Sequence, residues 1–533
     1  MNGNLSRRAF LAGSSALAAL ALAACGSPKE GDDDGSAAES TGSVLSVASA
    51  YAAQNYHPCT TSSSLALSAN RNVVEGLYEI DFRDWSVSPG LAAKDPVQTG
   101  ESTFEVTLRE GATFSDGSIV TSEDVVASFA RCLAEGNVFY PMVSCLASIE
   151  AKDPTTVVVT TTVPNFSLLR ERLAIVRIVP AAMDDEELAV LPVGSGPWVY
   201  ESIEQDMLCL RPNETYNGGH PALADELRFY PITDPNERVD AFLEGSAHIV
   251  EALPPQAFAQ VKTAGCKIDT VLGFDTRLIM FDIAKAPWND VRVRQAVMYA
   301  LDYDKIVTDV FLGQAEVPTG YLPTSSGFYH KASVTYARDM EKARALLKES
   351  GVNPGSIELL ATDNPQVSAI AAQVKTDLDI LGFDVTVNVM EAAKVYDTID
   401  QGGSYDLLVA SGDPSRFGAD PDLLMGWWFG DNAWMQTRCP WKDSDEWREL
   451  SSLMTQAAGQ RGEARQATWD RCIDILAENV VLYPIVHANT CTAYWFGNGN
   501  PSDGTVVSGF SGIGTSGVSL VDCQVVNGEK GVQ

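Results

Sequence analysis

The sequence predicts an α/β protein that folds as more than one lobe. Segments with a helical apolar stripe interleave with segments that alternate apolar and polar residues, which is typical of α/β proteins. The 533 residues exceed what one hydrophobic core usually supports, so two or three lobes are expected. Hydrophobic residues make up 45% of the chain, and it reads as globular from Val44 onward.

The first residues predict an export signal with a lipidation site. Ser6-Arg7-Arg8-Ala9-Phe10-Leu11 resembles a twin-arginine signal, and Leu22-Ala23-Ala24-Cys25 resembles the lipobox of bacterial lipoproteins. The uncharged run between them is shorter than the about 20 residues that span a bilayer. We expect residues 1–25 to be a lipoprotein signal peptide and Cys25 to carry the lipid. An ordinary secretion signal with a chance cysteine is the alternative.

Residues 26–43 predict a flexible acidic linker. They are small and polar, with too little apolar surface to offset chain entropy. No later apolar run is long enough to cross a bilayer. We therefore expect a body that is anchored to the membrane from outside the cell or in the periplasm, and not inserted in it.

The charge balance is strongly acidic, with a formal net charge of −33 from 70 acidic and 37 basic residues. The excess is spread along the chain, which argues against nucleic acid and anionic membrane surfaces as partners. It serves solubility alone or favours cationic or zwitterionic ligands.

Nine cysteines follow Cys25. In an oxidising compartment some should pair, and an odd count leaves at least one unpaired. No CxxC spacing occurs, and the five histidines show no HExxH, so we expect no metal and no cofactor. The nine are Cys59, Cys132, Cys145, Cys209, Cys266, Cys439, Cys472, Cys491 and Cys523.

Strands and helices can be placed in order along the first half. Val44–Ala48 is apolar enough for a strand, and a polar loop follows it. Thr103–Leu108 alternates as a half-buried strand. Thr121-Ser122-Glu123-Asp124 has the spacing of a capping box, so a helix should begin there and end by Gly136. Val157–Val159 is a further strand.

The second half carries clearer helical patterns. Asp290 can cap a helix whose stripe runs to Leu301. Two more stripes lead to Gly351 and Gly382, where glycine can end a helix. Phe383–Val389 then alternates as a strand.

Several stretches of the chain, taken in order, carry a family resemblance. They are Phe104–Gly117 with Thr121–Val125, Val193–Pro197, Asn213–Tyr216, Arg292–Asp302, Asp413-Pro414 and Asp420-Pro421-Asp422. The set resembles the extracytoplasmic solute-binding proteins of ABC importers, family 5, which includes oligopeptide, dipeptide and nickel binders. The resemblance extends from about Val44 to about Trp495.

The resemblance implies a two-lobed periplasmic-binding-protein-like fold of class II type, hinge-connected, with an extra subdomain on the first lobe. Lobe I would comprise residues 44–84, 191–276 and 486–533, its subdomain residues 85–190, and lobe II residues 277–485. The hinge strands would lie near Arg277–Phe281 and Leu482–Val486. Closure of the hinge around a ligand is the expected motion.

The aspartate-rich loop is the first candidate for a ligand site. Leu407–Ala410 predicts a buried strand, and ligand loops lie beyond such strand ends. The resemblance implies an amine-binding aspartate here, which makes Asp413 the first candidate. Because residues 415–419 form an insertion in the family pattern, Asp420 or Asp422 can take the role instead. Each aspartate can also be an ordinary turn former.

Aromatic and basic residues complete the candidate site. Arg416 either meets a ligand carboxylate or pairs with the nearby aspartate. Aromatic walls suit a ligand cleft, although core packing is the simpler role for each tryptophan. Polar residues after the first strand can face the cleft from the other lobe or form a surface loop. These candidates are Trp427, Trp428, Trp434, Tyr51 and Asn55.

The predicted function is that of a monomeric, membrane-tethered solute-binding lipoprotein that catalyses nothing. It would capture a small solute, with a peptide as the preferred candidate, in a closing interlobe cleft and deliver it to ABC transporter permease subunits. An exported hydrolase that uses the aspartate-rich loop on peptides or glycosides is the rival, although no GxSxG elbow or Walker loop occurs. A nickel- or haem-binding member of the same family is the third alternative, weakened by the few histidines.

Overall fold

The computed structural model describes residues 43–510, 513–514 and 517–528. The predicted signal peptide with Cys25 and the linker up to residue 42 lie outside the described residues. Within the described part, no helix is both long enough and apolar enough to cross a membrane.

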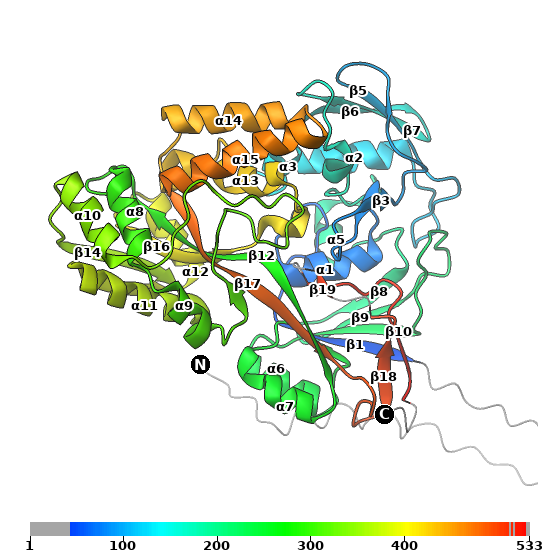
Figure 1. The fold of residues 1–533 in the computed structure, drawn as a ribbon. Coiled ribbons are helices and arrows are strands. Elements are labelled where there is room, and N and C mark those ends of the chain that lie inside the picture. The colour runs from blue at the N-terminus through cyan, green and yellow to red at the C-terminus, as the bar shows by residue number, and fades with distance from the viewer. Residues whose placement is uncertain (1–42, 511–512, 515–516, 529–533) are drawn as a thin grey trace, which may run out of the picture. The chain divides into compact units, whose positions relative to one another are not determined.

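One large sheet organises the described residues (Figure 1). Its 11 strands mix parallel and antiparallel pairs, and helices are interleaved with them, so the α/β prediction is confirmed. In spatial order the strands are β15 (Asp384–Met390), β14 (Ser356–Thr362), β16 (Leu407–Gly412), β12 (Lys267–Phe281), β17 (Leu482–Tyr494), β11 (Ile249–Val250), β1 (Val44–Ser49), β10 (Glu226–Pro231), β9 (Leu208–Pro212) and β8 (Trp198–Ile203), with β13 (Ala315–Glu316) paired to β17.

The long strands β12 and β17 join the two halves of this sheet (Figure 1). At one end of the pair, Lys267 lies opposite Tyr494, and β17 pairs on its other side with β11. At the other end, Met280 lies opposite Leu482, and β12 pairs on its other side with β16. The register shifts between Leu272 and Thr276, where the strand pair passes from one half to the other. We call the half with β1 and β8 to β11 lobe I, and the half with β14 to β16 lobe II.

Helices cover the sheet on both lobes. Lobe I carries α1 (Ser64–Val73), α6 (Pro235–Leu243), η1 (Pro255–Ala257) and α7 (Phe258–Thr263). Lobe II carries α8 (Val291–Ala300), α9 (Tyr303–Lys305), η2 (Ile306–Val310), α10 (Met340–Ser350), α11 (Pro365–Leu381), α12 (Ala392–Asp400), η3 (Pro414–Phe417), α13 (Pro421–Phe429), η4 (Trp434–Arg438), α14 (Asp445–Ala458) and α15 (Gly462–Asn479).

The predicted helix ends occur in the structure. The Asp290 side chain accepts a hydrogen bond from the Arg292 N–H at the start of α8. Gly351 and Gly382 end α10 and α11 with φ of 75° and 113°, a left-handed conformation that glycine adopts without strain.

A separate four-stranded sheet lies in the stretch predicted as a subdomain. Its order is β4 (Val97–Gln98), β5 (Thr103–Thr107), β7 (Thr156–Thr161) and β6 (Leu146–Asp153). Beside it lie α2 (Ser122–Cys132), α3 (Tyr140–Val143), α4 (Leu169–Leu173) and α5 (Asp185–Val190). The predicted capping box is present, since the Thr121 N–H donates to Asp124 at 2.8 Å. Short paired strands complete the fold: β2 (Tyr78–Ile80) with β3 (Val87–Pro89), β18 (Thr505–Ser508) with β21 (Gln524–Asn527), and β19 (Ile513–Gly514) with β20 (Gly517–Val518).

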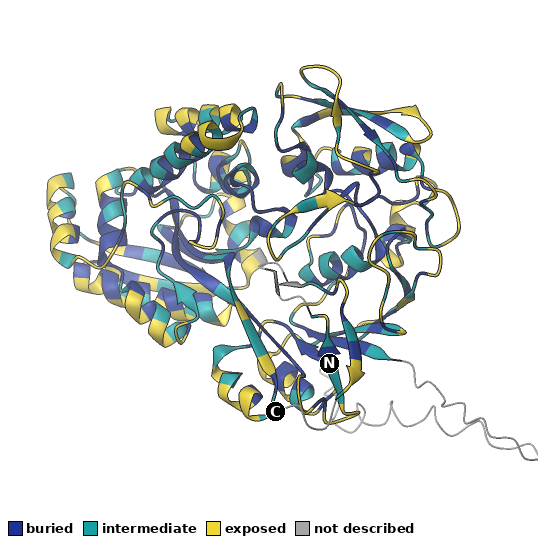
Figure 2. Cartoon of the chain, turned by 45° about the vertical axis from the view of Figure 1, so that its right-hand side comes forward, coloured by how far each residue is buried: buried dark blue, intermediate teal, exposed yellow. Residues whose placement is uncertain are grey.

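The prediction that some cysteines pair is wrong for the described residues. All nine are free thiols, and all but Cys145 are buried. The physical reason is that most of them serve as small apolar side chains inside the packed interior, which Figure 2 shows in dark blue. Burial raises the pKa of several of these thiols, including Cys266 and Cys491, to about 12.

Candidate ligand-binding cleft

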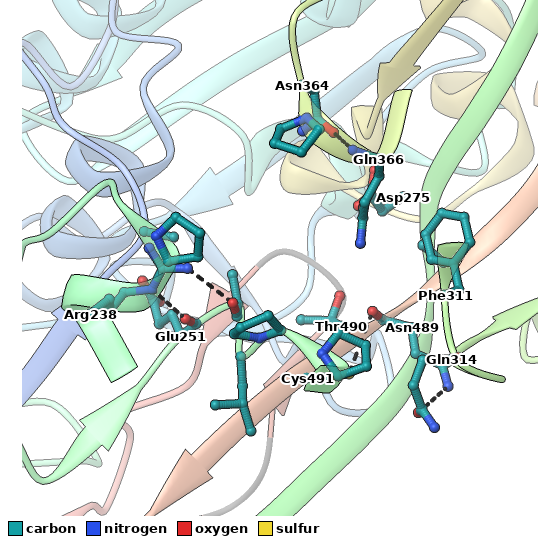
Figure 3. Close-up of a pocket in the computed structure, with 18 of the residues that line it drawn as sticks. Arg238, Glu251, Asp275, Phe311, Gln314, Asn364, Gln366, Asn489, Thr490 and Cys491 are labelled. Carbon is teal, nitrogen blue, oxygen red and sulfur yellow. Dashed lines mark hydrogen bonds between the residues drawn. The ribbon is translucent and has the colours of Figure 1, made fainter. Parts of the chain in front are cut away.

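A cavity of about 940 Å³ lies between lobe I and lobe II, next to the β12–β17 pair. This volume is at the upper end of the range for small-molecule sites. Figure 3 shows Arg238 and Glu251 on one side and Asp275, Asn364 and Gln366 on the other. The β17 segment from Ala488 to Thr492 also lines it. The cavity is therefore built from segments that are far apart in the sequence.

The wall that lobe I contributes is held by a buried arginine. Arg238, on α6, donates to the backbone oxygens of Ile232 at 2.7 Å, Glu251 at 3.0 Å and Ala252 at 3.0 Å. Burial lowers the pKa of Arg238, with the nearby Glu251 carboxylate opposing the shift. Because its donors serve the backbone, Arg238 fixes the shape of this wall.

Asp413 lies directly after β16 and lines the cavity. Its carboxylate accepts a hydrogen bond from the Ser415 N–H at 2.9 Å and another from the Ser415 hydroxyl. Burial raises the pKa of Asp413 to about 6; the Arg416 guanidinium opposes this rise, and the Asp275 carboxylate adds to it. The site therefore holds a carboxylate whose ionised form would be stabilised by a nearby positive charge.

Arg416 lines the same cavity, three residues further along the loop. Its guanidinium donates to the Ser64 hydroxyl and lies 5.6 Å from the centre of the Tyr51 ring. In the part of the chain that the structure describes, it forms no ion pair with Asp413 or with another carboxylate. Of the two roles that the sequence left open, pairing with Asp413 is thus not the one observed.

Asp420 and Asp422 lie outside the cavity lining and bind Arg172 of α4 instead. Arg172 donates to both oxygens of Asp420 at 2.8 Å and to Asp422 at 2.7 Å. Arg172 and Asp420 are buried, and the guanidinium outweighs burial and keeps the pKa of Asp420 below its usual value. Asp420 also caps α13 through the Leu423 N–H. These contacts explain why the two carboxylates are directed away from the cleft.

The three tryptophans also lie behind the cavity wall. Trp428 and Trp434 contact each other with ring centres 4.5 Å apart, and Trp427 stacks with Phe417 at 6.3 Å. A Cβ on Gly412 would lie 2.4 Å from the Trp428 ring, so glycine lets β16 approach this aromatic group. Their observed role is packing that supports the loop.

Of the two lobe I candidates, Tyr51 lines the cavity and Asn55 does not. Tyr51 lines the cavity and is 45% exposed. Asn55 is not among the lining residues and stabilises its own loop: it donates to Thr60 at 3.1 Å and accepts from the His57 N–H at 2.9 Å.

Sequence reasoning missed several lining residues. Arg277 is 5% exposed; it donates to the Gln366 side chain at 2.6 Å and forms an ion pair with Asp275. An arginine next to the apolar run Leu278–Phe281 was the available signal, because buried charges need partners. Gln314 and Asn489 also line the cavity, and the Asn489 amide donates a hydrogen bond to the Gln314 side chain at 3.1 Å. No feature of the sequence marked these two amides as lining residues.

No group of three or more His, Cys, Asp or Glu side chains within the described ranges is arranged to hold a metal ion.

Comparison with known proteins decides the family. The profile described as bacterial extracellular solute-binding proteins, family 5 middle, matches residues 86–436. The chain belongs to this family. The family prediction is therefore confirmed, and the family 5 member described here is a solute-binding protein.

Its curated relatives are binding proteins as well. The glutathione-binding protein GsiB of Escherichia coli K12 is 28% identical over 348 residues, which cover 63% of this chain and 67% of the relative. The protein of the same name from Salmonella typhimurium LT2 is 27% identical over the same lengths.

Solved structures show the same two-lobed fold. AgaA of A. tumefaciens R10, in complex with agropinic acid, has a TM-score of 0.77 at 24% identity and covers 91% of this chain and 99% of its own. The dipeptide-binding protein of Pseudoalteromonas sp. SM9913, in complex with Met-Leu, has a TM-score of 0.76 at 18% identity and covers 90% and 99%. The predicted fold class is confirmed.

Proposed function

We propose that this family 5 member captures a small solute that carries a free ammonium group, with a peptide as the first choice, and delivers it to the permease subunits of an ABC importer. One observation carries the proposal: the partly buried carboxylate of Asp413 lines an interlobe cavity of peptide-like size. An ammonium group would donate charge-assisted hydrogen bonds to it, worth roughly 1.5 to 3 kcal/mol each. The names of the relatives, which bind glutathione and dipeptides, support a peptide ligand.

The experiment compares free and blocked amines. Binding of a dipeptide and tripeptide library is measured by calorimetry, and the tightest ligand is then tested in its N-acetylated form. Asp413→Asn should weaken binding of the free amine by at least about tenfold and leave the acetylated form within about twofold. Asp445→Asn, at an exposed side chain outside the cavity lining, is the control. Equal losses for both ligand forms in Asp413→Asn would remove the anchor role.

The lobe boundaries and the hinge remain part of this proposal. The register shift of the β12–β17 pair near Thr276 supports a hinge at this point, next to the predicted range Arg277–Phe281. Leu482–Val486, the second predicted range, is paired with this part of β12. We propose that the two lobes close by rotation about this strand pair.

The absence of catalysis is likewise proposed. The Ser46 hydroxyl lies 2.7 Å from Nδ1 of His248, whose Nε2 lies 3.4 Å from Asp503, but Ser46 is 3% exposed on β1 and does not line the cleft. Asp420 and Asp422, the carboxylates of the hydrolase alternative, are engaged by Arg172. Mass spectrometry after long incubation should return every bound peptide intact, and a cleavage product would favour the hydrolase.

The lipid anchor and the monomeric state complete the proposal. Cys25 lies outside the described residues, so its support is the lipobox-like sequence alone. No nucleic acid partner is proposed, because the net charge of −33 opposes it.

A further inference from the structure

The loop after β16 presents two opposite charges to the cleft on a fixed backbone. Arg71 of α1 donates to the backbone oxygen of Arg416 at 2.6 Å. The buried Phe417 ring contacts Phe139 at 5.3 Å between ring centres. Ser415, fully buried, binds the Asp413 carboxylate. Since both neighbours of Arg416 are held in the interior, the spacing between Asp413 and Arg416 is set before any ligand arrives.

The charge of Arg416 acts on Asp413, but the two side chains do not form an ion pair with each other. Arg416 is the largest charge effect on Asp413, yet the two side chains form no ion pair. A guanidinium has five N–H donors, and within the described residues that of Arg416 makes one hydrogen bond, to Ser64, and contacts the ring of Tyr51. The loop therefore offers the cavity, three residues apart, an acceptor for an ammonium and a donor for a carboxylate.

We propose that Asp413 and Arg416 together recognise an α-amino acid head group, in which the ammonium and the carboxylate are attached to the same carbon. This deepens the proposed function, on which it rests, by naming the ligand class. The class comprises peptides and conjugates joined through a side chain, such as γ-linked glutamyl peptides. In an ordinary α-peptide the carbon that bears the ammonium carries a neutral amide, which would leave Arg416 without its anion.

The rest of the cleft suits the remainder of such a ligand. The cavity is also lined by the amide side chains of Gln314, Asn364, Gln366 and Asn489. Primary amides both donate and accept, so they can bind the neutral amide groups that follow the head group.

Two isomeric dipeptides test the proposal. γ-Glutamylalanine and α-glutamylalanine have the same composition and charge, but only the γ isomer has ammonium and carboxylate on one carbon. Calorimetry should show at least about tenfold tighter binding of the γ isomer, falling to about twofold or less in Arg416→Gln. Arg416→Lys should keep part of the preference. Arg344→Gln, on the exposed side of α10, is the control and should keep all of it.

The outcomes separate this inference from the peptide proposal. If both isomers bind but equally, or if Arg416→Gln leaves the preference unchanged, the head-group inference is overturned and the peptide ligand stands. If neither dipeptide binds, the peptide ligand is decided by the library measurement, and free glutamate is compared with isoglutamine, its α-amide. Binding of glutamate alone would support the head group; equal binding, or none, would overturn it. The wild-type comparisons do not depend on whether a variant folds.

Discussion

At the scale of single residues, the cleft shows why identical side chains take different roles. Asp413 and Asp420 both belong to the aspartate-rich loop, and both cap a helical turn. Arg172 lies against Asp420 and holds its pKa down, whereas Asp413 forms no ion pair within the described residues, and burial raises its pKa. A carboxylate without an ion-pair partner is the one that gains from a ligand cation.

The pH dependence of binding follows from this raised pKa. An ammonium ligand needs the ionised form of Asp413, which is lost as the pH falls through about 6. Affinity should be constant near pH 7 and fall by up to about tenfold per pH unit below the pKa. Calorimetry of the tightest amine ligand from about pH 5 to 7 tests this, and Asp413→Asn should give a flat profile. A flat profile in the wild type would contradict it.

The same pKa has the opposite consequence for the unliganded fold. Because the folded-state pKa is raised, Asp413 favours folding below its ordinary pKa of 3.8, and this advantage is lost as the pH rises through about 6. At pH 7.5 Asp413→Asn should therefore stabilise the unliganded protein, by about 1 kcal/mol after allowance for partial exposure. Thermal unfolding at pH 7.5 and pH 4.5 measures it; a gain of equal size at both values would point to another cause.

At the scale of elements, an ion pair joins α4 to the start of α13. The side chains of Arg172 and Asp420 are 2% and 5% exposed. Water therefore cannot solvate either charge if the other one is removed. Arg465 of α15 adds a contact nearby, donating to Ser167 at 3.2 Å. These contacts hold the loop that carries Asp413, although they lie outside the cavity.

Breaking this ion pair should be costly. Arg172→Met leaves Asp420 buried without its partner, and we expect a loss of about 3 to 5 kcal/mol, measured by thermal or urea unfolding. Arg170→Met is the matched control, because Arg170 pairs with Asp95 and both are exposed; it should cost less than about 1 kcal/mol. Adding Asp420→Asn to Arg172→Met should recover part of the loss. Similar effects of the two arginine variants would contradict the assignment.

At the scale of the whole molecule, the cleft and the strand pair β12–β17 belong together. Ligand contacts from lobe I and lobe II would be complete only when the lobes are close, so a ligand favours the closed arrangement. Small-angle scattering should therefore show a smaller radius of gyration with saturating ligand. Asp413→Asn should need at least about tenfold more ligand for the same decrease. Identical wild-type curves with and without ligand would contradict hinge closure.

Attachment to the membrane is also a property of the whole protein. If Cys25 carries the lipid, Cys25→Ser should release the protein into the soluble fraction of cells, with unchanged ligand affinity after purification. Immunoblotting of membrane and soluble fractions measures this, and retention in the membrane would reject the lipid anchor.

The sequence by itself determined the α/β class, the main helix ends and the family, because these depend on local periodicity, capping residues and ordered motifs. It also brought Asp413, Arg416 and Tyr51 forward as candidates, and all three line the cavity. Only the tertiary structure decided that Asp420 binds Arg172, that the tryptophans pack behind the wall, and that Arg277 and Gln366 reach the cleft. Each of these facts depends on a contact between distant segments, and no local pattern records which charge will meet which partner.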